Sequence, residues 1–169
     1  TQKTIHFDIY LAGLTIYRLL NGNAHYNSQF NFATQQAYID SIVAGSFPNR
    51  NSYLPHVPLK LQRIVNKALS VNIADRHQNV LELINELSSI DENLDWLYTK
   101  NGAVESWRKI GSDKTHEVVL DSSQANQLKI ESRKTMHNNG NTTKVAAHCH
   151  NNLTKNNVLS NIKKAFKDL

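Results

Sequence analysis

The tripeptide His148-Cys149-His150 contains the side chains of this chain that are best suited to hold a metal ion. Imidazole nitrogens and thiolates are preferred ligands of Zn²⁺, and two histidines separated by one residue share a face of a strand. Two ligands are too few for a stable site, and His116 or His137 would complete one only if the strand register brought them near. We therefore expect solvent-facing histidines without a metal, and Cys149 on the opposite, apolar side.

Asp8 is a second candidate, because this carboxylate directly precedes an apolar stretch over residues 9–20. A carboxylate among apolar side chains can act as a catalytic acid or base. The same position suits N-capping, in which the side chain accepts backbone N–H groups of the first helical turn. We expect a structural role for Asp8, and the sequence offers no catalytic or cofactor-binding residue.

Basic side chains in the C-terminal part form the third candidate. Residues 1–99 contain 7 Lys and Arg against 8 Asp and Glu, whereas residues 100–169 contain 12 against 6. A positive sheet face can bind the phosphates of nucleic acid, but lysines also protect strand edges from unwanted pairing. We expect a solvated surface, with a nucleic-acid or acidic partner as the alternative. The side chains concerned are Arg108, Lys109, Lys114, Lys129, Arg133, Lys134 and Lys144.

Composition excludes several classes of protein. The single cysteine rules out an intrachain disulfide and any Cys-x-x-Cys zinc or redox motif. The longest apolar run, over residues 9–20, is far shorter than the roughly 20 residues that span a bilayer. We therefore expect no membrane association and a cytoplasmic location.

Four helices are predicted in the first ninety residues. Apolar side chains over residues 8–20 cover nearly the whole helix circumference, which indicates a helix surrounded by protein and stopped by Asn21-Gly22. A narrower stripe predicts a peripheral helix over residues 32–44. The three prolines, at positions 48, 55 and 58, then predict a loop that ends where Pro58 opens the next helix. The last two predicted helices cover residues 59–69 and 80–87.

Strands and one more helix are predicted in the rest of the chain. Asn139-Gly140 predicts a hairpin turn, because both residues tolerate positive φ. Thr154 is a candidate N-cap of the final helix. The sequence thus predicts an α+β fold, in which an antiparallel β-meander and a C-terminal helix follow a helical part. The expected strands are residues 106–110, 116–120, 127–136 and 142–150.

The domain organisation follows from this change of pattern. We expect a helical domain over residues 1–90, a linker over residues 91–103 and a basic α+β accessory domain over residues 104–169. Trp96 and Trp107 bracket the predicted boundary, so we expect them to pack between the two domains.

Two motifs resemble the second half of the catalytic domain of protein kinases. The first has the spacing of the F helix in bacterial serine/threonine kinases: Asp8-Ile9-Tyr10, Gly13, Tyr17 and Leu19-Leu20-Asn21-Gly22. The second is Ala74-Asp75-Arg76 before residues 80–87, similar to the closing pattern in which an arginine precedes the final helix. Residues 1–90 therefore resemble the last third of that domain, from the F to the I helix.

The resemblance implies supporting roles for two residues. Asp8 would hold backbone amides of the catalytic loop, and Arg76 would pair with a glutamate that closes the activation segment. The Gly-rich loop, the Val-Ala-Ile-Lys lysine and the His-Arg-Asp, Asp-Phe-Gly and Ala-Pro-Glu motifs do not occur in the sequence. Phosphoryl transfer requires these groups, because they bind ATP and Mg²⁺ and orient the hydroxyl that is phosphorylated.

We therefore expect an inactive fragment of a bacterial signalling kinase whose parent transfers the ATP γ-phosphoryl group to protein serine or threonine. ATP and Mg²⁺ would belong to the parent, and the fragment would hold no cofactor. Its partners would be the missing N-terminal part of the kinase domain and the parent's protein substrate. The alternative is a non-catalytic, pseudokinase-like scaffold whose basic C-terminal domain binds a protein or nucleic-acid partner.

Overall fold

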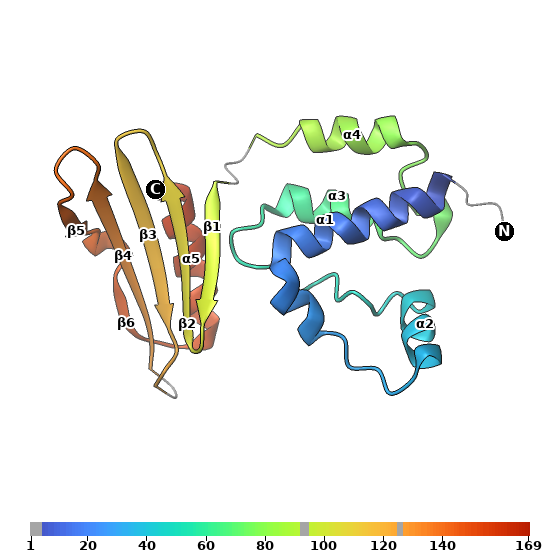
Figure 1. The fold of residues 1–169 in the computed structure, drawn as a ribbon, viewed down its shortest axis with the longest axis horizontal. Coiled ribbons are helices and arrows are strands. Elements are labelled where there is room, and N and C mark those ends of the chain that lie inside the picture. Colours follow the sequence, from blue (N-terminus) through green and yellow to red (C-terminus); the bar gives the residue numbers. More distant parts are fainter. Residues whose placement is uncertain (1–4, 92–94, 125–126) are drawn as a thin grey trace. The chain divides into compact units, whose positions relative to one another are not determined.

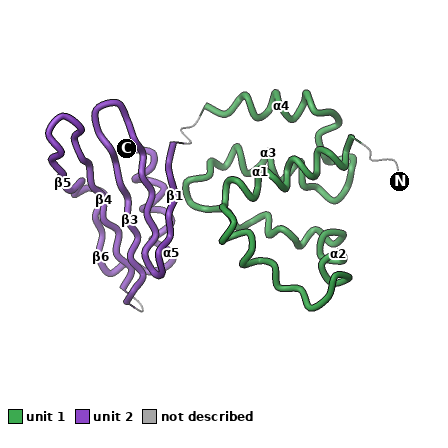
Figure 2. The backbone as a smooth tube through the Cα atoms, in the orientation of Figure 1, with its two compact units in different colours: residues 1–92 green, residues 93–169 purple. Residues whose placement is uncertain are grey.

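The computed structural model describes residues 5–91, 95–124 and 127–169. It divides into two compact units, Thr1–Glu92 and Asn93–Leu169, which are green and purple in Figure 2. The described part of unit 1 is helical, and unit 2 contains an antiparallel sheet with one long helix (Figure 1). The predicted α+β class is confirmed.

Unit 1 contains four α-helices in the predicted order. The first continues past the expected stop, because Gly22 makes a kink with φ of 75° and ψ of 160° and the helix then resumes. Glycine suits this kink because it lacks the Cβ that disfavours positive φ. The helices are α1 (Ile5–Ser28), α2 (Gln35–Val43), α3 (Leu59–Ala68) and α4 (Val80–Ser88), with a short 3-10 helix, η1 (Ile73–Asp75), before α4.

Helix α1 is buried along one stripe only. Ile9, Gly13 and Tyr17 recur at four-residue steps on this stripe, whereas Leu11 and Leu19 are 41% and 76% exposed. The prediction of a helix surrounded by protein is therefore wrong for this structure. Hydrophobic residues all round a helix indicate burial only where other elements cover every side.

The buried stripe of α1 packs closely against α3. A Cβ added at Gly13 would lie 2.8 Å from the Cβ of Ala68, so the absence of a side chain permits this approach. Ile9, Ile64, Ala68 and Leu83 form a small core. Helix α2 is peripheral, as predicted, because none of its residues is buried.

Unit 2 is a six-stranded antiparallel sheet with the strand order β1-β2-β3-β4-β5, in which β6 pairs with β4. The predicted meander with a C-terminal helix is confirmed, and helix α5 (Lys155–Asp168) buries Val158, Ile162 and Ala165 against one face. Thr154 precedes this helix as predicted, but its side chain makes no capping hydrogen bond. The strands are β1 (Trp96–Asn101), β2 (Val104–Ile110), β3 (Lys114–Asp121), β4 (Leu128–Met136), β5 (Thr142–Lys144) and β6 (His150–Leu153).

The expected linker over residues 91–103 contains a strand. Strand β1 lies within it and pairs with β2 in continuous register from Trp96 and Lys109 to Asn101 and Val104. Trp96 and Trp107 both lie in the core of unit 2 with Phe166 of α5. The expectation that they pack between two domains is therefore wrong, because strand pairing places both indoles beneath α5.

The last predicted strand is broken. Residues 142–150 contain strand β5, the 3-10 helix η2 (Ala146–His148) and only the first residue of β6. The hairpin before it forms as predicted, but among the described residues of the turn only Gly140 has positive φ, at 68°. The side chain of Asn139 accepts a hydrogen bond from the Asn141 amide at 2.9 Å.

Candidate functional site

The kinase resemblance singles out Asp8, in the first turn of α1, and Arg76, which contacts that turn. Asp8 is exposed in the first turn, and its carboxylate has no hydrogen-bond or ion-pair partner within the described ranges. Arg76 follows η1, and its guanidinium lies 5.0 Å from the ring of Tyr10. The resemblance implies partners outside this chain for both residues, so these roles stay predictions.

Arg76 ties the segment before α4 to the first turn of α1. Its Nη1 donates a hydrogen bond to the His6 carbonyl at 3.1 Å, and Nη2 and Nε donate to the carbonyls of Val71 and Ser70. Burial lowers the pKa of Arg76, but an arginine starts from so high a value that it stays charged at neutral pH. Three charge-assisted hydrogen bonds make Arg76 a structural clamp with two N–H groups left over.

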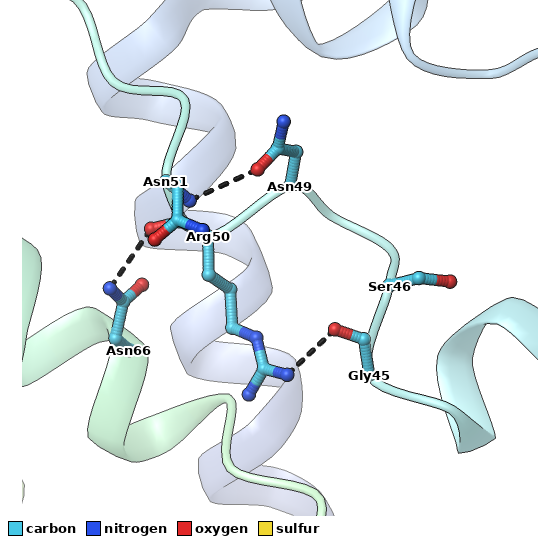
Figure 3. A pocket seen from close by; sticks show the side chains of 6 residues that line it. All are labelled: Gly45, Ser46, Asn49, Arg50, Asn51 and Asn66. Carbon is cyan, nitrogen blue, oxygen red and sulfur yellow. Dashed lines mark hydrogen bonds between the residues drawn. The ribbon is translucent and has the colours of Figure 1, made fainter.

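A polar pocket of about 530 Å³ opens between the end of α2, the loop that follows it and helix α3 (Figure 3). The sequence did not indicate this pocket, because only the prolines of that loop were informative. The succession Asn49-Arg50-Asn51 could have indicated the pocket, because three hydrogen-bonding side chains in an ordered loop need partners. The pocket is lined by Gly45, Ser46, Asn49, Arg50, Asn51 and Asn66.

Arg50 organises this pocket. Its Nη2 donates to the Gly45 carbonyl at 2.6 Å, and its own carbonyl accepts from Asn66 Nδ2 (Figure 3). Its Nη1 donates to the Leu69 carbonyl. Gly45 has φ of 70°, and a Cβ there would lie 2.4 Å from Arg50 Nη2. The guanidinium is thus committed to the backbone, and the lining contains no carboxylate, imidazole or thiol for acid-base or nucleophilic chemistry.

Residues of α1 hold the same loop from the other side. The Tyr17 hydroxyl lies 2.9 Å from the Asn49 carbonyl and 2.8 Å from that of Ser52, and the Asn21 side chain accepts from the Leu54 amide at 2.9 Å. Asn21 was predicted only as part of a helix stop. Its buried amide instead fixes a loop more than thirty residues away in the sequence, which no local pattern indicates.

A network of charged side chains joins α3 to α4. Lys67 Nζ lies 2.5 Å from a Glu82 oxygen and 2.6 Å from a Glu86 oxygen, and the other Glu86 oxygen is 3.1 Å from Nε2 of buried His77. The hydrogen bonds that Lys67 donates to Glu82 and Glu86 raise its pKa. Lys67 thus bridges two carboxylates of α4, and this arrangement serves the packing of the two helices.

The histidines and the cysteine of unit 2 do not converge. The turn of η2 breaks the alternation expected for His148 and His150, and Cys149 donates its S–H to the Val145 carbonyl at 3.4 Å. His137 is bonded to Thr115, on the opposite face from His116. Within the described residues, no three His, Cys, Asp or Glu side chains are placed to hold a metal ion. The expectation of solvent-facing histidines is wrong for His116 and His148, which are buried.

The basic side chains divide between the two faces of the sheet. Strand alternation places Arg108, Lys129, Arg133 and Lys144 on the face that α5 does not cover. There, Glu131 lies 2.7 Å from Lys129, 2.6 Å from Arg133 and 3.5 Å from Lys144. Hydrogen bonds from Lys129 and Arg133 lower the pKa of Glu131 to about 2. This internal counter-charge disfavours the uncovered face as a nucleic-acid interface.

The remaining cations, Lys109, Lys114 and Lys134, lie on the face that α5 covers, around His116.

Across the part of the chain that the structure describes, no helix is both long enough and apolar enough to cross a lipid bilayer. Comparisons of the chain with protein-family models, curated proteins and solved structures found no match. The function must therefore be argued from the geometry.

Proposed function

We propose that unit 1 is the scaffold part of the large lobe of a serine/threonine protein kinase, and that a separate segment supplies the residues that bind ATP and Mg²⁺. The chain itself then has no phosphotransferase activity, because phosphoryl transfer depends on a lysine, metal-binding carboxylates and a catalytic aspartate at fixed positions. The role of unit 1 is to position that segment.

The surface of α1 supports this proposal. Asp8, Leu11 and Leu19 recur at helical spacing on the face opposite the buried stripe, and all three are exposed. Within the described residues, this aspartate has no partner and lies beside large apolar side chains. A covering segment could donate its backbone amides to the carboxylate and bury the apolar side chains. This unpartnered stripe is the observation that carries the proposal.

Arg76 offers a second attachment point at the same end of α1. Its three hydrogen bonds to carbonyls fix the guanidinium, while its two remaining N–H groups can donate to a carboxylate from outside the chain. Because these hydrogen bonds already hold the side chain in place, such a contact would cost less conformational entropy.

Two assays test the proposal. The isolated chain, incubated with radiolabelled ATP, Mg²⁺ and casein, is expected to transfer no phosphate. A longer chain that includes the in-frame coding sequence upstream of Thr1 is expected to phosphorylate casein. In that longer chain, Asp8→Asn should lower kcat at least about tenfold, because small displacements of catalytic groups are costly. Asp40→Asn is the matched control, since Asp40 is an exposed aspartate of α2.

Phosphate transfer by the isolated chain would contradict the scaffold role. The kinase proposal itself is overturned if the upstream sequence encodes no His-Arg-Asp and Asp-Phe-Gly motifs, or if the longer chain is inactive. In either case the chain would be a non-catalytic interaction module. Equal activity of Asp8→Asn and Asp40→Asn would remove the supporting role of Asp8.

A further inference from the structure

Three strands of unit 2 place basic side chains in a row on the face that α5 covers. His116 of β3 is directly opposite Lys109 of β2 and Lys134 of β4. Lys114 lies two residues before His116 and therefore on the same face. Neighbouring strands are about 4.8 Å apart, so the flexible lysine side chains can all reach the imidazole in the middle.

The imidazole of His116 is the unusual member of this row. The residue is only 8% exposed, and its Nδ1 atom is buried with no hydrogen-bond partner in the described chain. A buried polar atom without a partner costs free energy, so its presence in a folded chain needs an explanation. Burial, then the charges of Lys114, Lys109 and Lys134, lower the pKa of His116, and Asp113 acts in the opposite direction.

The three lysines lack the counter-charges that the opposite face provides. Among the described residues, no Asp or Glu oxygen lies within 4.0 Å of Lys109, Lys114 or Lys134. Lys109 Nζ donates a hydrogen bond to the main-chain oxygen of Leu169 at 3.2 Å. By contrast, three cations of the uncovered face surround Glu131.

We propose that Lys109, Lys114, His116 and Lys134 form a binding site for a phosphate group. The ammonium groups supply the charge, and the other ring nitrogen of His116, Nε2, donates a hydrogen bond to one phosphate oxygen. Charge-assisted hydrogen bonds of this kind are roughly twice as strong as neutral ones. The bound dianion also offsets the mutual repulsion of three nearby lysines. The site is independent of the phosphotransfer proposal, because it lies within unit 2.

Nuclear magnetic resonance of the full chain tests this site. The ring signals of His116, assigned with a His116→Gln variant, are followed as inorganic phosphate is added at constant ionic strength. Saturable shifts are expected, together with a rise in the pKa of His116, because a bound anion favours its charged form. Phosphoserine and adenosine monophosphate are titrated in parallel to distinguish a phosphoprotein from a nucleotide as the source of the phosphate.

Two double variants distinguish binding at this site from a general effect of positive charge. Lys114→Ala with Lys134→Ala should weaken phosphate binding at least about tenfold. Lys129→Ala with Lys144→Ala removes the same charge from the other face and should leave binding unchanged. Circular dichroism checks that both double variants fold. A double variant that does not fold is replaced by the double substitution to glutamine at the same positions. Absent or unsaturable shifts, or equal weakening in both variants, would overturn the proposal.

Discussion

The core of unit 2 lies between the sheet and helix α5, whereas unit 1 leaves large apolar side chains exposed to solvent on several of its helices. Trp107, Val118, Ile130 and Ile162 of unit 2 are each at most 1% exposed. Unit 1 buries Ile9 and Tyr17 as completely, but exposed apolar side chains remain on α1 and α4. The difference indicates that unit 2 has the more completely covered core.

Unit 1 relies more on polar side chains that bond to the backbone. Arg50 joins Gly45 to Leu69, and Arg76 joins the first turn of α1 to the segment before α4. Such bonds fix loops at defined places but bury little apolar area, which is the main source of folding free energy. Unit 1 is thus built to hold loops and surfaces in position, while unit 2 is built as a self-sufficient core.

The largest expected effect is on the core of unit 2. Ile162→Ala should lower the free energy of unfolding of unit 2 by about 3 kcal/mol, because it leaves a cavity beneath α5. Urea unfolding followed by tryptophan fluorescence measures it, since both tryptophans lie in unit 2. Leu159→Ala, at a position on the same helix that is 46% exposed, is the control. Similar losses in both variants would contradict a self-sufficient core.

The next effect concerns the polar clamps of unit 1. Arg76→Ala should destabilise unit 1 by about 2 kcal/mol, because three carbonyls lose a charged donor. Circular dichroism at 222 nm during urea unfolding reports it, since most helical residues belong to unit 1. Arg63→Ala is the matched control, because Arg63 is exposed on α3. If removal of Arg76 is as harmless as removal of Arg63, the clamp does not stabilise unit 1.

A smaller effect is expected at the contact of α1 with α3. Gly13→Ala should destabilise unit 1 by about 1 kcal/mol, because the overlap with Ala68 outweighs the better helix propensity of alanine. The helical signal during thermal and urea unfolding measures the change. Thr15→Ala, on the exposed face of α1, should be neutral or slightly stabilising. A stabilised Gly13→Ala variant would show that the two helices can separate without cost.

An effect of similar size is electrostatic and depends on pH. The folded-state pKa of Glu131, about 2, lies below its ordinary value of 4.5, so its contribution is complete above pH 4.5 and is lost as the pH falls towards 2. Glu131→Gln should abolish this pH dependence. It should also lower the free energy of unfolding of unit 2 at pH 7 by about 1 kcal/mol. Tryptophan fluorescence during unfolding at several pH values tests it. Glu117→Gln, outside these ion pairs, should keep the wild-type pH dependence.

Predictions from the sequence succeeded where a pattern is local and periodic. The four helices of unit 1 and the meander of unit 2 follow from spacings of three, four and two residues. They failed where neighbours decide the outcome. The apolar circumference of α1 did not reveal which side would be covered, and the acidic stretch before Trp96 concealed a strand that forms only because β2 is beside it.

The candidate sites divide in the same way. Asp8 and Arg76 were found because their spacing resembles a known family, and the basic residues because they are numerous. The pocket around Arg50 and the row through His116 were not found, since each combines side chains from segments that meet only after folding. Hydrogen bonds to distant carbonyls leave no periodic trace in a sequence.

The sequence by itself determined the α+β class, the order of the helices, the hairpin at Gly140 and the basic character of unit 2, because local periodicity, turn chemistry and composition are enough for these. Only the tertiary structure decided which face of α1 is covered, that Trp96 and Trp107 share one core, and that Glu131 neutralises one face of the sheet while His116 lies among lysines on the other. Strand register and helix packing make these choices, and both depend on contacts between residues far apart along the chain.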